Sequence, residues 1–139
     1  MITKNLLFID TETIGSITCR DGCVPFEIGA KVLDTCTGKV LFQRSYIVRR
    51  FINNKYIMLG SFSAGKYPSY LERIKNDKRF KVLSALEISK DLKRVIKKYN
   101  IGVWVAHNGG FDKDAISRYF NDMLISLNFP FSITFTVEI

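Results

Sequence analysis

The stretch that decides the fold is Leu6-Leu7-Phe8-Ile9-Asp10-Thr11-Glu12-Thr13, in which four large apolar residues lead directly into two acids. Such an apolar run predicts a strand buried on both faces, at the centre of a sheet. Asp10 and Glu12 follow at its end, and their i, i+2 spacing turns both side chains to the same side. Neighbouring carboxylates repel each other unless a cation lies between them, so we predict half of a magnesium or manganese site. The alternative is that Asp10 caps a turn and Glu12 is merely solvated.

The composition is that of a single globular domain, which we expect to span residues 1–139. Hydrophobic residues make up 47% of the chain and charged residues 24%. No segment approaches the roughly 18 uninterrupted apolar residues of a membrane span, and the N-terminus does not resemble a signal peptide. The three cysteines, Cys19, Cys23 and Cys36, are too few and odd in number for a disulfide framework. We therefore expect a cytoplasmic protein without a membrane partner.

The net charge of +8 is concentrated in the middle of the chain. Residues Arg44 to Lys81 include ten basic and two acidic side chains, and aromatic residues are interleaved with the basic ones. This pattern suits a phosphate backbone with bases to stack on. We predict that the substrate-binding residues of this block are Arg49, Arg50, Lys55 and Lys66. A lysine-rich solubilising surface is the alternative.

Hydrophobic periodicity predicts the remaining elements. Strands over residues 26–33 and 40–48 flank a short turn and should form an antiparallel meander with the first strand. Residues 49–65 show no clear pattern and predict a loop with room for one helical turn. The other predicted elements are helices over 67–75, 84–99 and 114–127 and strands over 101–106 and 131–137. The order βββαβαβ predicts an α/β fold with a mixed sheet.

The helix after residue 84 has the clearest sequence markers. Ser84-Ala85-Leu86-Glu87 has the form of a capping box, which marks a helix N-terminus. An apolar stripe at helical spacing follows and predicts the face packed on the core. The residues of this stripe are Leu86, Ile88, Leu92, Val95, Ile96 and Tyr99.

A second acidic loop follows the strand predicted at 101–106. His107-Asn108-Gly109-Gly110-Phe111-Asp112 breaks that strand as abruptly as Asp10 breaks the first. If the two strands are parallel neighbours, Asp112 arrives beside Asp10 and Glu12, because sites in α/β sheets form at the carboxyl ends of strands. Three converging carboxylates favour a two-metal centre, with cations about 4 Å apart on one phosphodiester. Asn108 can join two loops through side-chain hydrogen bonds, and we group it with the substrate-binding residues.

The two acidic segments together resemble the first two motifs of the DEDD, or DnaQ-like, 3′-to-5′ exonucleases. The motifs are Asp10-Thr11-Glu12-Thr13 and Ala106-His107-Asn108-Gly109-Gly110-Phe111-Asp112, each after an apolar strand. The resemblance implies a ribonuclease H-like fold with a five-stranded mixed sheet. It also implies metal-dependent hydrolysis at the 3′ end of single-stranded DNA or RNA, with two Mg²⁺ or Mn²⁺ ions.

The same resemblance assigns roles to individual residues. Asp10, Glu12 and Asp112 would bind the metals as the catalytic acids, and Glu12 would also sense the terminal 3′ hydroxyl. Thr11 and Thr13 would provide backbone contacts to the last nucleotide. Phe111 would pack or stack near the penultimate one. His107 is a weaker candidate for the general base, because in the family its position precedes the Asn without transferring a proton, and a structural role is favoured.

The chain departs from the family pattern in three places. Ile14 stands where the family commonly has Thr, and Ser16 stands where it has an apolar wedge. The family's third motif lies on a helix after the fifth strand and supplies a fourth metal-binding Asp together with a His or Tyr base. No acid after Asp112 has that placement, so we expect a C-terminally incomplete domain whose final helix is missing.

Two classes of function are open at this point. The first is an exonuclease, weak or inactive as this short chain, in a phage or bacterial replication or repair setting. An enzyme that trims only RNA is a variant of it. The second is a catalytically incomplete module that binds nucleic acid or a partner protein. A missing helix would leave a sheet face open, which replication proteins or a second copy of the chain would cover.

Overall fold

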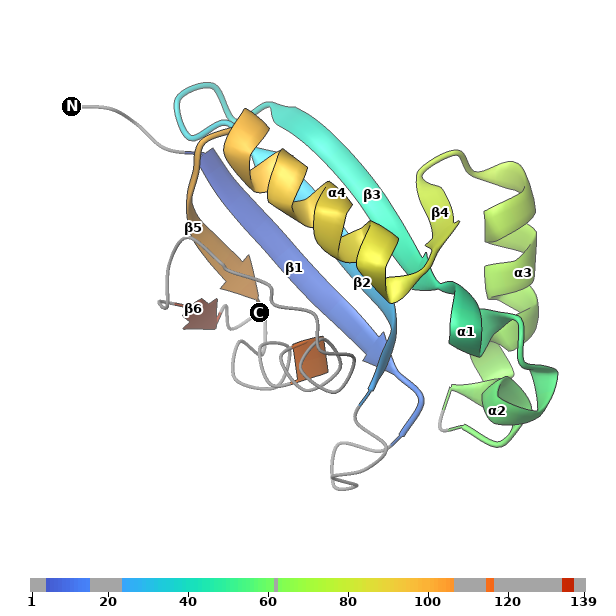
Figure 1. The fold of residues 1–139 in the computed structure, drawn as a ribbon. Coiled ribbons are helices and arrows are strands. Elements are labelled where there is room, and N and C mark those ends of the chain that lie inside the picture. The colour runs from blue at the N-terminus through green and yellow to red at the C-terminus, as the bar shows by residue number, and fades with distance from the viewer. Residues whose placement is uncertain (1–4, 16–23, 62, 107–114, 117–133, 137–139) are drawn as a thin grey trace.

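The computed structural model describes residues 5–15, 24–61, 63–106, 115–116 and 134–136. Within these residues, six strands form one mixed sheet in the order β4-β3-β2-β1-β5-β6 (Figure 1). The strands are β1 (Asn5–Thr13), β2 (Pro25–Leu33), β3 (Val40–Val48), β4 (Phe80–Leu83), β5 (Ile101–Ala106) and β6 (Thr134–Thr136). The helices are α1 (Arg49–Ile52), α2 (Lys55–Leu59), the 3₁₀ turn η1 (Ala64–Lys66), α3 (Tyr67–Asn76) and α4 (Ala85–Lys98).

The strand pairing confirms the predicted topology around β1. Strands β1, β2 and β3 pair antiparallel in sequence order, which is the expected meander. On its other side β1 pairs in parallel with β5, and β3 pairs in parallel with β4. The carboxyl ends of β1, β3, β4 and β5 therefore lie at one edge of the sheet, where an α/β site is expected.

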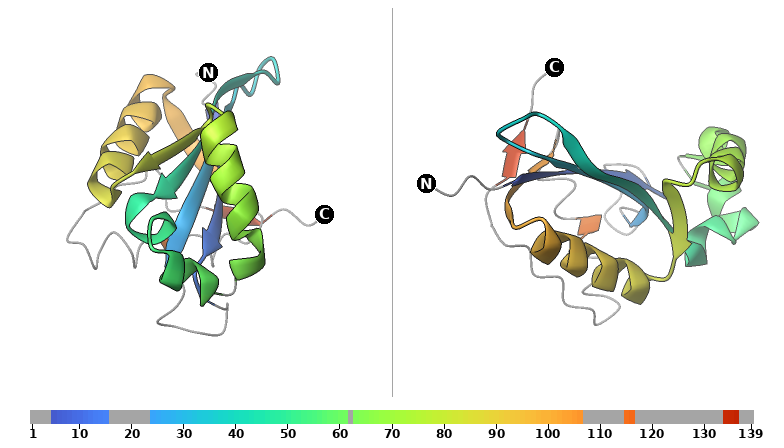
Figure 2. Two further views of the ribbon diagram at one scale, coloured as in Figure 1. Left: turned by 90° about the vertical axis from the view of Figure 1, so that its right-hand side faces the viewer. Right: turned by 90° about the horizontal axis from the view of Figure 1, so that it is seen from above.

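Burial along β1 alternates between the two sides of the sheet. Leu7 and Ile9 are buried, whereas Leu6 and Phe8 are only partly buried. Figure 2 shows α4 lying along one face of the sheet, with α1, α2 and α3 beyond one end. The prediction of a central strand is confirmed. Successive strand residues point to opposite sides, and of the two predicted buried faces only the one that α4 covers is confirmed as buried.

Helix α4 begins with the predicted capping box. Ser84 Oγ accepts a hydrogen bond from the Glu87 N–H at 3.2 Å, and Glu87 Oε1 accepts one from the Ser84 N–H at 3.3 Å. Ile88, Leu92 and Val95 are buried as expected. Leu86 is 51% exposed, so its assignment to the apolar stripe is wrong. At about 100° per residue, Leu86 lies roughly 120° around the helix from Leu92, beyond the packed face.

Residues 49–65 hold more structure than predicted. Instead of a loop with one helical turn, they form α1, α2 and part of η1. Phe51, Ile52 and Met58 are buried and hold these short helices on the core. Asn54 caps α2, since its side chain accepts a hydrogen bond from the Ile57 N–H at 3.1 Å. The prediction failed here because such short helices depend on packing more than on their own periodicity.

The short strand β4 was also missed, so the sheet gains an edge strand beyond the five predicted. It pairs with the last four residues of β3, from Ser45 to Val48. The predicted helix at 67–75 is confirmed as α3, with Pro68 in its first turn. Of the predicted helix at 114–127, the structure describes Ala115 and Ile116, which are helical and buried. Of the predicted strand at 131–137, it describes β6.

None of the helices in the described part of the chain combines the length and apolar character that crossing a membrane requires.

Candidate active site

Asp10 and Glu12 lie on the face of β1 that points away from α4. Asp10 is exposed and the Glu12 side chain is 32% exposed, while Thr11 and Thr13, between and beyond them, are buried. This alternation confirms that the two carboxylates share one side of the strand. Two oxygen-donor side chains on one side suit a hard divalent cation, so these residues fit half of a magnesium or manganese site.

Strand β2 keeps the space beside Asp10 open. In the antiparallel register, Asp10 pairs with Gly29 and Glu12 pairs with Glu27. A Cβ atom built on Gly29 would lie 3.6 Å from the Asp10 carbonyl oxygen and 3.9 Å from the Asp10 Cβ, which is ordinary van der Waals contact. Glycine is therefore not needed for the backbone, but any side chain here would occupy the surface next to the Asp10 carboxylate.

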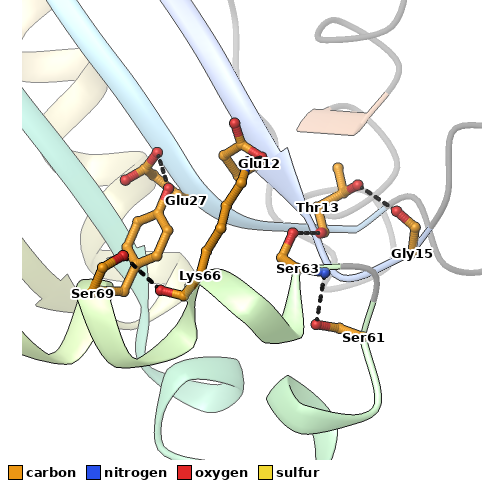
Figure 3. Close-up of polar contacts among 9 residues, drawn as sticks. Glu12, Thr13, Gly15, Glu27, Ser61, Ser63, Lys66 and Ser69 are labelled. Carbon is orange, nitrogen blue, oxygen red and sulfur yellow. Dashed lines mark hydrogen bonds and ion pairs between the residues drawn. The ribbon is translucent and has the colours of Figure 1, made fainter.

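Lys66, at the end of η1, places a cation on Glu12. Its Nζ lies 3.2 Å from Glu12 Oε2, and the two side chains are 57% and 32% exposed (Figure 3). An ion pair this exposed contributes little to stability because water and salt screen it. The ion pair matters locally. A cation bound by Glu12 must either share the carboxylate with the Lys66 ammonium or displace that ammonium. Lys66 was predicted to bind substrate, and the structure places it on a candidate catalytic acid.

The chain before Lys66 also fixes the end of β1. Ser63 is buried, and its Oγ donates a hydrogen bond to the Thr13 carbonyl at 3.2 Å (Figure 3). Thr13 Oγ1 in turn donates to the Gly15 carbonyl at 2.9 Å. The Thr13 carbonyl and hydroxyl are thus engaged within the protein. The predicted backbone contacts of Thr11 and Thr13 to a nucleotide stay predictions.

Glu27 is a third acid on this face that sequence reasoning did not single out. Its Oε2 accepts a hydrogen bond from Ser45 Oγ at 2.7 Å, and its Oε1 accepts one from the Tyr70 hydroxyl at 2.9 Å. Burial raises the pKa of the Glu27 carboxyl, the hydrogen bonds from Ser45 and Tyr70 oppose this rise, and the charges of Glu12 and Asp10 add to it. The surroundings of Glu27 therefore disfavour its ionised form.

We predict that Glu27→Gln stabilises the protein increasingly as the pH rises. The pKa of Glu27 is raised above its ordinary value of 4.5, so the folded protein keeps a proton that the unfolded chain releases. The contribution of Glu27 to the free energy of unfolding is therefore complete below pH 4.5 and is lost as the pH rises through the folded-state pKa. The neutral amide avoids this loss, so the thermal midpoint should exceed that of the wild type by a few degrees more at pH 8 than at pH 4.

Glu72→Gln serves as the control for this measurement, because it removes an exposed carboxylate from α3. Its thermal midpoint should follow the wild type at both pH values. A difference between Glu27→Gln and the wild type that stays constant from pH 4 to pH 8 would contradict the strained ionisation of Glu27.

A broad depression of about 1150 Å³ covers this face of the sheet. Asp10, Glu27 and Gly29 contribute to its floor, and Arg73 lies on its wall from α3. The remaining lining includes Phe8, Lys31, Leu33, Gln43, Ser45, Asp77, Arg79, Phe80 and Val105. The depression therefore holds acids and cations side by side.

The cations of the depression differ in their partners. Arg79 pairs with Asp77 at 2.8 Å, and its hydrogen bonds lower the pKa of Asp77 to about 2. The Arg73 guanidinium lies 5.8 Å from the centre of the Tyr70 ring. Among the residues that the structure describes, Arg73 and Lys31 form no ion pair. Both side chains line the depression together with Asp10.

The three other basic residues predicted to bind substrate lie apart from the carboxylates. Arg49 Nη1 forms an ion pair with Glu87 at 3.2 Å, and its Nη2 donates to the Val82 carbonyl at 3.4 Å. Arg50 and Lys55 are exposed and line a separate concavity beside the start of α4. The four predicted basic residues therefore do not form one cluster.

The second acidic motif, from His107 onward, lies outside the described residues. This applies to His107, Asn108, Phe111 and Asp112, so the convergence of Asp112 on Asp10 and Glu12 stays a prediction. The parallel pairing that it requires is confirmed, because Phe8 pairs with Val105 on β5. Within the described ranges, no three acidic, histidine or cysteine side chains are close enough to hold a metal ion.

Comparison with known proteins identifies a fold but no sequence family. No family model matches the chain, and no curated protein matches it. The structure is similar to the crystallographic structure of the nuclease domain of 3′hExo, a DEDDh family member, bound to rAMP. The TM-score is 0.59 with 14% sequence identity, over 93% of this chain and 64% of the 3′hExo chain. This chain thus spans under two thirds of that one, and its fold is the predicted α/β, ribonuclease H-like fold.

Proposed function

We propose that this protein is a metal-dependent nuclease that hydrolyses phosphodiester bonds at the 3′ end of single-stranded nucleic acid. The observation that carries the proposal is the placement of Asp10 and Glu12 on one side of the central strand, where Asp10 lines the depression. The similar fold of 3′hExo supports it, because that domain is a nuclease and was crystallised with a nucleotide, rAMP.

Asp10 and Glu12 would hold the divalent cations, with Asp112 as the third acid. When bound, such cations polarise phosphoryl oxygens and make water a stronger nucleophile at neutral pH. Glu27, paired with Glu12 across the strands, is a further acid beside the proposed cation site. Arg73 and Lys31 would neutralise phosphate oxygens of the strand in the depression, which suits a polyanionic substrate.

The direct test is digestion of a single strand labelled at one end or the other, with Mn²⁺ or Mg²⁺ present. A strand labelled at its 5′ end should shorten stepwise, whereas one labelled at its 3′ end should release a labelled mononucleotide at once. A chelator should stop both reactions. Parallel DNA and RNA strands would identify the preferred sugar. Intact strands of both kinds after long incubation with either cation would refute the proposal.

A second candidate function is a nuclease-like module that binds nucleic acid without cleaving it. The Lys66–Glu12 ion pair favours this alternative, because it already neutralises a carboxylate that a cation would need. Substituting both Asp10 and Asp112 by Ala distinguishes the two. A binding module keeps its affinity for the strand and its biological effect, whereas a nuclease loses its activity.

A further inference from the structure

A second concavity, of about 660 Å³, lies between the α1–α2 segment and the start of α4. We call it the α1–α2 groove and define it by Arg50, Asn53, Lys55, Tyr56 and Ser84, which line it. Figure 1 shows the two short helices next to the N-terminal end of α4. The groove thus lies toward the face that α4 covers, whereas Asp10 and Glu12 point to the other face.

The groove carries an excess of positive charge. Arg49, on its wall, is balanced by the ion pair with Glu87. Arg50 and Lys55 have no carboxylate partner among the described residues. Two exposed cations without a carboxylate partner form an attractive surface for phosphate groups.

Tyr56 gives the groove an exposed aromatic ring. Its exposed fraction is 88%, the highest among the large hydrophobic side chains that the structure describes. The ring is held on a fixed element, since Asn54 caps α2 and Met58 anchors the helix in the core. An exposed ring flanked by Lys55 is the combination on which proteins stack the bases of single strands.

We propose that the α1–α2 groove binds a single-stranded nucleic acid upstream of its 3′ end. Arg50 and Lys55 contact phosphates, and one base stacks on Tyr56. Because it extends the proposed function, this assignment rests on the 3′ end lying at Asp10 and Glu12. The chain from Arg49 to Lys66 connects the two places, since Lys66 contacts Glu12.

The two places lie too far apart for one nucleotide to touch both. Arg49 follows β3, which is two strands away from β1, or about 10 Å across the sheet at roughly 4.8 Å per strand. The groove and the carboxylates also lie toward opposite faces. We therefore expect a dinucleotide at the carboxylates to stay outside the groove and only a longer strand to reach it.

The test compares the double variant Arg50→Gln/Lys55→Gln with the control Lys75→Gln/Lys78→Gln, which removes two exposed charges outside both concavities. The probe is a fluorescent 12-nucleotide phosphorothioate strand, titrated in chelator at several salt concentrations. The groove variant should lower the slope of log affinity against log salt by about 1.4, or 0.7 for each lost phosphate contact. Tyr56→Ala should weaken binding about tenfold, as expected for the loss of one stacked base.

Three results with the long strand, its control and an acidic peptide overturn the groove assignment. These are an unchanged slope and affinity in the groove variants, a loss in the control variant of the same size, and equal groove-dependent binding of an acidic peptide such as polyglutamate. A dinucleotide should bind all variants equally, and groove dependence of its affinity would also contradict the assignment. Groove-dependent binding of the long strand by a protein that never cleaves it would refute the proposed nuclease and support the groove.

Discussion

Asp10→Asn is expected to reduce the rate of 3′-end hydrolysis by about 10²- to 10⁴-fold. A carboxylate contact to a catalytic cation supports several kcal/mol of transition-state stabilisation, and each 1.4 kcal/mol is a factor of ten in rate. The amide has nearly the shape of the carboxylate but no charge, and Asp10 is exposed on its strand, so the fold should persist. Initial rates with a 5′-labelled strand and the Mn²⁺ affinity from calorimetry measure the two effects separately.

The matched control is Asp34→Asn, which removes the same charge from the turn between β2 and β3. That turn follows Leu33, which pairs with Leu6 near the start of β1, so it lies at the opposite end of the strands from the carboxyl end of β1. The control should keep the rate and the Mn²⁺ affinity of the wild type. An Asp10→Asn variant that cleaves within a few-fold of the wild type would show that Asp10 does not serve the reaction.

The sequence predicted the elements whose signals are local. Strand β2 alternates as expected, with Phe26 and Ile28 buried and Glu27 on the other side. The capping box set the start of α4 at Ser84. Strand β4 has only four residues and exists through its pairing with β3, a contact between distant segments. Leu86 was assigned to the core by its apolar character, but its angle around the helix decided its exposure.

The candidate site was predictable only where neighbouring residues define it. The spacing of Asp10 and Glu12 alone places them on one side of a strand. The contacts of Glu12 with Lys66 and of Thr13 with Ser63 join residues about 50 positions apart, and no local pattern signals them. Glu27 had a partial signal, since the alternation of β2 turns it away from the core. Its pairing with Glu12 depends on a register that residues 14–24 do not reveal.

Trp104→Ala is expected to lower the free energy of unfolding by about 3–5 kcal/mol. Trp104 lies on β5, has no exposed surface and is the largest of the fully buried side chains in the described residues. It pairs with Leu7 on β1 and with Thr134 on β6. The indole therefore fills the core beneath the strands that lead to both acidic motifs. A loss of this size is a large part of the stability of an ordinary domain. Urea unfolding at neutral pH measures it.

Val103→Ala is the matched control, because Val103 is the preceding residue of β5, points to the other side and is only partly buried. It should cost about 1 kcal/mol. Equal urea midpoints for Trp104→Ala and the wild type would mean that β5 does not pack as a core strand beside β1. The route by which Asp112 reaches Asp10 depends on that packing, because β5 ends at Ala106, immediately before the second acidic motif.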